Sequence, residues 1–121
     1  MKWVLIIEPS NDRFNYLNRV ISRLGYRSYR AVSAYEGIRF LGESIPDAIL
    51  CGEDLPDRNL LDLCRGINEN PMTPGTPLLL TSSNKGRFFR RRSLRGGAVE
   101  VVYMEAPVSD LFQKLDICIS K

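Results

Sequence analysis

The chain has 121 residues, of which 44% are hydrophobic and 26% charged, and this composition excludes a disordered chain and fits one globular domain over residues 1–121. No apolar run approaches the roughly 20 residues of a membrane span, and the start lacks the features of a signal peptide, so we expect a cytoplasmic protein. The chain has no histidine and only three well-separated cysteines, which excludes the common zinc and haem sites, so we expect no bound metal or cofactor.

The first half of the chain alternates between strand and helix patterns. Residues 2–7 form a continuous apolar run that is typical of a buried parallel strand. Ser10 is a predicted N-cap for a helix whose apolar residues recur at helical spacing. The alternating segment 26–31 predicts a second strand, and the capping-box pattern at 33–36 starts a second helix that continues to about Leu41.

The second half continues the same alternation. Residues 48–51 predict a third strand, and Asn59 is a predicted cap for a third helix. Residues 77–81 and 98–104 predict the fourth and fifth strands, and Pro107 precedes a last helix. Five strand–helix repeats predict a parallel sheet that is covered by helices on both faces, with right-handed crossovers. Ligands of such folds bind beyond the carboxyl ends of the strands.

The segment between the last two strands, residues 84–95, holds six of the 17 basic residues and no acidic residue. It predicts a helix that buries Phe88 or Phe89 with Leu94 and exposes several guanidinium groups. Arg91 and Arg95 are one helical turn apart, so they could hold one anion together. An acidic protein partner is the simplest interpretation, and a nucleotide or nucleic acid is the alternative, because closely spaced arginines suit phosphates. No base-reading motif is present, so we do not expect recognition of a DNA sequence.

A set of short landmarks runs along the whole chain. They are Val4-Leu5-Ile6-Ile7-Glu8, Leu24-Gly25-Tyr26, Pro46-Asp47-Ala48-Ile49-Leu50, Leu55-Pro56, Thr76-Pro77-Leu78-Leu79-Leu80-Thr81-Ser82, Gly97-Ala98, Tyr103 and Pro107. In this order and spacing they resemble the receiver domains of bacterial two-component response regulators. The resemblance runs from about Lys2 to Ile119 and implies a flavodoxin-like (βα)5 fold, a doubly wound α/β structure with a five-stranded parallel sheet.

The resemblance also implies which positions of this chain correspond to the residues that carry out phosphorylation in this family. The pair of acids that holds Mg²⁺ falls on Glu8 and Pro9, and the aspartate that accepts the phosphoryl group falls on Gly52. The hydroxyl residue that bonds the phosphate falls on Thr81, which is kept. The lysine that neutralises the phosphate falls on Ala106. Phosphoryl transfer depends mostly on positioning and charge neutralisation, so these losses predict a receiver-like domain that is not phosphorylated at the usual site.

Three expectations concern the residues left in this pocket. We expect Glu8 to be a solvated carboxylate at a strand end that binds Mg²⁺ poorly by itself. We expect Thr81 to cap the next turn through its hydroxyl. An unusual acceptor, Glu53 or Asp54, remains an alternative that would make the chain an active receiver.

With its pocket degenerate, the chain is predicted to be a non-enzymatic module that binds a signalling partner. The predicted surface combines Arg87, Arg90, Arg91, Arg95 and Tyr103, the last of which occupies the coupling aromatic position of the family and is expected to stay fixed. The alternative is a sensor that binds a phosphorylated small molecule, such as a cyclic dinucleotide second messenger, through the arginine-rich fourth helix.

Overall fold

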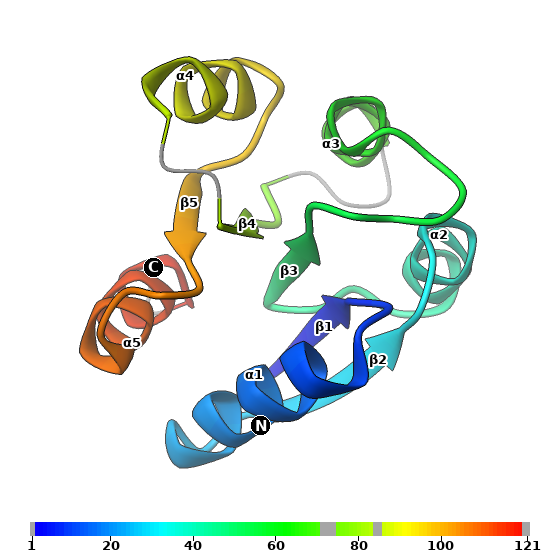
Figure 1. Cartoon of the computed structure of the whole chain (residues 1–121). Helices are drawn as coiled ribbons and strands as arrows, with labels where there is room; N and C mark the ends of the chain where they lie inside the picture. The colour runs from blue at the N-terminus through cyan, green and yellow to red at the C-terminus, as the bar shows by residue number, and fades with distance from the viewer. Residues whose placement is uncertain (1, 71–74, 84–85, 120–121) are drawn as a thin grey trace.

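The computed structural model describes residues 2–70, 75–83 and 86–119, and in this part of the chain five strands alternate with five helices (Figure 1). The predicted order of elements is confirmed, and the boundaries differ by one to three residues. The elements are β1 (Trp3–Ile7), α1 (Asn11–Arg23), β2 (Arg27–Ala31), α2 (Ala34–Glu43), β3 (Ala48–Gly52), α3 (Leu60–Glu69), β4 (Leu78–Ser82), α4 (Arg87–Arg95), β5 (Glu100–Tyr103) and α5 (Val108–Ile119).

The strands form one five-stranded sheet in the order β2-β1-β3-β4-β5, and every neighbouring pair is parallel. The chain moves from β1 outward to β2, returns to β3 on the other side of β1, and continues to the opposite edge. This is the predicted doubly wound topology. The register pairs Ile7 with Cys51 and Gly52 with Thr81, so the last residues of the three central strands meet at the same edge.

Helices cover both faces of the sheet (Figure 1). On one face α1 and α5 pack against the sheet through a cluster that includes Leu17, Ile21 and Leu115. On the other face Leu41 of α2, Leu63 of α3 and Phe89 of α4 pack against a second cluster. Strands β3 and β4 are buried along their whole length. Burial on both faces explains why these strands are continuous apolar runs in the sequence.

Two of the predicted helix caps are confirmed in detail. The hydroxyl of Ser10 accepts a hydrogen bond from the N–H of Arg13, and the hydroxyl of Ser33 accepts one from Glu36. Helix α4 begins at Arg87 with Gly86 as N-cap, and the predicted start at 84–85 lies outside the described residues. Cys118 of α5 is only half-buried and packs against the cluster on the α1 and α5 face, whereas Cys51 and Cys64 are buried.

The start of β1 and the end of α5 lie together at the amino edge of the sheet. The ammonium group of Lys2 donates a hydrogen bond of 2.7 Å to the backbone carbonyl of Ile119. Among the described residues, no helix has the length and apolar character needed to cross a membrane.

Candidate functional site

The carboxyl edge of the sheet brings together the positions that the family resemblance singles out. Glu8 follows β1, Gly52 ends β3, and Thr81 lies beside Gly52 on β4. Ala106 follows β5, where its N–H donates to the carbonyl of Tyr103 at 3.0 Å. The sequence therefore predicted correctly which positions share this edge, because the carboxyl ends of neighbouring parallel strands meet there.

The carboxylate of Glu8 occupies the space beside Gly52 where another residue would carry its side chain. A Cβ atom built on Gly52 would lie 2.5 Å from Oε1 of Glu8 and 3.0 Å from its Cδ. Glu8 is only 1% exposed, so the expectation of a solvated carboxylate is wrong. The physical reason is Gly52 itself, because its missing side chain leaves a volume that the Glu8 side chain fills.

Local hydrogen bonds hold Glu8 and the turn after β1. Oε2 of Glu8 accepts a hydrogen bond of 3.0 Å from the N–H of Ser10. The guanidinium of Arg30 donates to the backbone carbonyls of Glu8 and Pro9, at 3.1 and 3.0 Å, and lies over the ring of Phe14. The turn is therefore tied both to the start of α1 and to β2.

Two buried oxygen atoms at this edge have no hydrogen-bond partner among the described residues. They are Oε1 of Glu8 and Oγ1 of Thr81. Thr81 is 2% exposed, and its hydroxyl does not cap the next turn, so that expectation is wrong. The residue that bonds across the edge is instead Ser82, whose hydroxyl donates to Oε2 of Glu53 at 2.5 Å.

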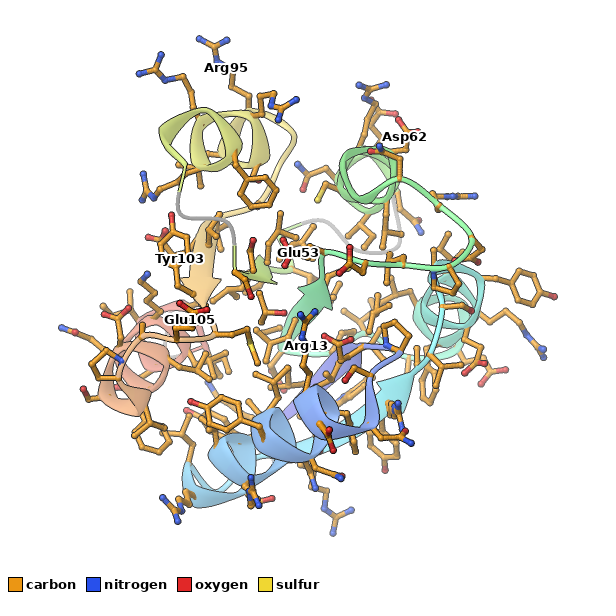
Figure 2. All side chains as sticks on the ribbon, in the orientation of Figure 1. Arg13, Glu53, Asp62, Arg95, Tyr103 and Glu105 are labelled. Carbon is orange, nitrogen blue, oxygen red and sulfur yellow. The ribbon has the colours of Figure 1, made fainter. Side chains whose placement is uncertain are left out.

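The loop after β3 carries three acidic residues, and each is directed at a different element. Glu53 accepts from the hydroxyl of Ser82 and, through Oε1, from the N–H of Ser83 at 3.0 Å. Asp54 pairs with the guanidinium of Arg13, which reaches from α1 toward the strand ends (Figure 2), at 3.8 Å. Asp57 accepts from the N–H groups of Ala34 and Tyr35 and thereby caps α2.

These contacts determine which carboxylate oxygens remain free to bind a cation. Both oxygens of Glu53 and one oxygen of Glu8 accept hydrogen bonds, and Asp54 is turned toward Arg13. Within the described ranges, no three acidic or cysteine side chains form a group that could hold a metal ion. Pro9 contributes a carbonyl, which Arg30 occupies, where the family would have a second acid.

The cap that Asp57 provides leads to a prediction about acid. Hydrogen bonds from the N–H group of Ala34 and, with a smaller effect, from that of Tyr35 hold the pKa of Asp57 below its ordinary value of 3.8. A carboxyl whose pKa is lowered by folding adds stability that is fully present above the unfolded value and is lost as the pH falls through the folded value. Asp57→Asn should therefore lower the urea midpoint at neutral pH, and the difference from the wild type should vanish in strong acid.

Urea titrations across the acid range measure this difference. Glu43→Gln, which removes an exposed carboxylate at the other end of α2, is the control and should not lower the midpoint. A midpoint difference for Asp57→Asn that stays constant down to the lowest pH would contradict the capping role.

The predicted partner surface is divided between two sides of α4. Phe89 packs toward the sheet, and Ser93 is fully buried with its hydroxyl donating to the carbonyl of Phe89 at 2.8 Å. The guanidinium of Arg90 pairs with Glu100 of β5 at 3.0 Å, and Arg91 is exposed. Arg95 instead lines a groove on the α3 side. The side chain of Arg87 lies outside the described part of the structure.

Tyr103 lies on β5 between α4 and α5 (Figure 2). Its ring is half-buried and packs against the cluster beneath α2, α3 and α4. Nζ of Lys114 lies 5.7 Å from the ring centroid, and the same ammonium donates to the carbonyl of Val101 and pairs with Asp110. Tyr103 and Glu100, which pairs with Arg90, both lie on β5, whereas Arg95 lines the groove on the α3 side.

Sequence reasoning missed four residues of this region. Ser82, Asp57 and Arg13 link the loops of the carboxyl edge, and Arg92 faces the α3 side of α4. Ser82 ends an apolar strand, and acidic residues follow the neighbouring strand β3 at the same edge of the sheet. This combination could have identified Ser82 as a partner of those acidic residues. The orientation of Arg92 could not be predicted from the sequence, because it depends on which face of α4 is buried.

Solved structures that are similar to this chain include receiver domains and response regulators. A protein from Chloroflexus aurantiacus assigned as a response regulator superposes with a TM-score of 0.93, covers 99% of this chain and 98% of its own, and is 21% identical. The receiver domain of a histidine kinase from Syntrophus aciditrophicus gives 0.89 over 99% of this chain and 91% of its own, with 23% identity.

A third solved structure has the same fold. The receiver domain of a sensor histidine kinase from Pseudomonas aeruginosa, which holds a magnesium ion in its active-site cleft, gives a TM-score of 0.89 at 19% identity over 99% of this chain and 98% of its own. No protein-family model and no curated protein matches the sequence. The likeness therefore lies in the fold, and the chain has the flavodoxin-like fold of receiver domains.

Proposed function

Taking this receiver fold as the premise, we propose that the chain is a signal-transduction module of the two-component type that binds a partner protein without being phosphorylated at the usual position. The observation that carries the proposal is the buried carboxylate of Glu8 beside Gly52. Gly52 has no group that could accept a phosphoryl group, and Glu8 fills the volume that an acceptor would need.

The surroundings of Gly52 support the same proposal. Phosphoryl transfer in receiver-like pockets needs a metal ion and a cation to neutralise charge. Ala106 supplies no cation, and the carboxylates of Glu8, Glu53 and Asp54 do not form a donor set that fits a magnesium ion. We therefore propose that the module acts without bound magnesium and without catalysing a reaction.

The proposed partner surface lies on α4, β5 and α5. Arg90 and Arg91 of α4 are exposed, and Tyr103 of β5 with Lys114 of α5 forms a half-buried patch. Helix α4 carries five arginines and no acid, so a partner with an acidic surface would be attracted to it. Arginine and tyrosine are also enriched at protein interfaces.

The first test asks whether the protein accepts a phosphoryl group. The full chain is incubated with acetyl phosphate and magnesium, and its intact mass is recorded together with NMR spectra in the presence of beryllofluoride. We expect no phosphoryl adduct and no shifts at Thr81. An adduct on Glu53 or Asp54, or magnesium-dependent beryllofluoride shifts around Thr81, would overturn the proposal.

The second test asks whether the α4–β5–α5 surface binds the partner. A partner captured with the full chain is titrated against Arg90→Ala/Arg91→Ala and against Arg19→Ala/Arg23→Ala, a matched pair of exposed arginines on α1. We expect the first variant to weaken binding by roughly tenfold or more and the second to leave it unchanged. Equal binding by both variants, or binding that requires acetyl phosphate, would contradict the proposal.

A further inference from the structure

A groove of about 460 Å³ lies between α3 and α4, on the side of α4 that faces away from β5 and α5. It is lined by Arg65, Asn68, Glu69, Arg92, Arg95 and Gly96. Figure 2 shows Arg95 on the side of α4 that faces away from the sheet. Asp62, the other acidic residue of α3, lies about one turn before Arg65 and does not line the groove.

Three guanidinium groups share this groove with one carboxylate, that of Glu69. Arg65, Arg92 and Arg95 are all exposed, and within the described residues none of them makes an ion pair. Arg90, on the other side of α4, is by contrast paired with Glu100. Like charges that face one concave surface repel one another, and a bound anion removes this repulsion.

The packing of α3 against α4 fixes the positions of these arginines. Burial of Phe89 and Ser93 turns Arg92 toward α3, and Arg95 follows three residues later on the same side. Gly97, at a φ of +118°, approaches the side chain of Asn68 so closely that a Cβ atom there would lie 1.8 Å from Nδ2. The end of α4 is thus held against the end of α3 by a contact that only glycine permits.

We propose that this groove binds the phosphate group of a small phosphorylated molecule such as a nucleotide. Guanidinium groups bind phosphate through paired, charge-assisted hydrogen bonds, and three of them suit a compact anion with more than one negative charge. The neighbouring groove is lined by three carboxylates, those of Glu53, Asp54 and Asp57, and by the guanidinium groups of Arg58 and the shared Arg92. Its excess of negative charge disfavours a long polyanion that would extend into it. The site is separate from the α4–β5–α5 surface, and either can be present without the other.

The test titrates the full chain with inorganic pyrophosphate, ADP and a cyclic dinucleotide, using calorimetry and amide NMR. We expect at least one of them to bind with a dissociation constant below roughly 100 µM at about 0.1 M salt and to shift amides of α3 and of the α4 end. Amide shifts caused by pyrophosphate would show that the phosphate itself is the recognised group. Tighter binding of ADP or of the cyclic dinucleotide would show that the phosphate belongs to a nucleotide. The absence of binding at millimolar concentrations of all three would overturn the proposal.

Variants of α4 distinguish a built site from general positive charge. Arg92→Gln/Arg95→Gln should weaken binding by roughly tenfold or more, whereas Arg90→Gln/Arg91→Gln, which removes the same number of charges from α4 outside the groove, should change it less than about twofold. Equal losses in the two variants would show that only the net charge of α4 matters and would overturn the proposal. Circular dichroism of each variant confirms that the fold is kept. Loss of partner binding in Arg90→Ala/Arg91→Ala with intact pyrophosphate binding would separate the two proposals.

Discussion

Replacing Gly52 by alanine or aspartate should destabilise the protein, and the loss should depend on Glu8. Alanine places a Cβ atom 2.5 Å from Oε1 of a buried carboxylate, which we expect to cost about 1 to 3 kcal/mol of unfolding free energy. Aspartate adds a second carboxylate in the same buried contact, and this like-charge pair should cost about 1 to 2 kcal/mol more at neutral pH. Neither variant should gain phosphorylation, because Ala106 still supplies no cation.

A double-mutant cycle separates crowding from charge. Both substitutions are measured by urea unfolding in the wild-type chain and in Glu8→Ala, and the coupling energy should be about 1 to 2 kcal/mol. Gly42→Ala is the control, because a Cβ atom at Gly42 in α2 would have no neighbour within 4 Å. This control should be neutral or stabilising, as expected for glycine within a helix. Losses of the same size with and without Glu8 would show that Glu8 does not fill the space beside Gly52.

The second large effect is expected at Gly97. Gly97→Ala should lower the unfolding free energy by about 2 to 4 kcal/mol, because the backbone adopts a φ of +118° and the new Cβ would overlap the side chain of Asn68. In the Asn68→Ala background the overlap is gone, and the remaining loss of about 1 to 3 kcal/mol reports the backbone strain alone.

The same substitution also tests the anion groove independently. Displacement of the end of α4 should weaken pyrophosphate binding, whereas Gly42→Ala should leave it unchanged. A Gly97→Ala protein with wild-type stability would contradict the close approach of α3 and α4 that positions Arg92 and Arg95.

Most of the fold could be predicted because it depends on local pattern. Continuous apolar runs predicted the buried strands, and Ser10 and Ser33 marked the helix starts where their hydroxyls accept the N–H groups of the first turn. The alignment of Gly52 with Thr81 could also be predicted, because strand order and parallel pairing decide which strand ends are neighbours.

The details of the site could not be predicted, because they depend on packing between elements far apart in the sequence. Glu8 is buried because Gly52, more than 40 residues away along the chain, leaves an unfilled volume. The two sides of α4 are distinguished by the burial of Ser93, a small polar residue whose hydroxyl bonds to its own helix. No apolar periodicity marks such a residue as buried. The prediction from the sequence therefore placed the arginines of α4 on one surface.

The hydrogen bond between Lys2 and the carbonyl of Ile119 has a consequence for how the domain can be joined to other proteins. It joins the side-chain ammonium of Lys2, just before β1, to the backbone of the last residue of α5, at the amino edge of the sheet. Glu8, Gly52 and Thr81 lie at the opposite edge. A fluorescent fusion or an immobilisation tag at either end would therefore leave that edge accessible.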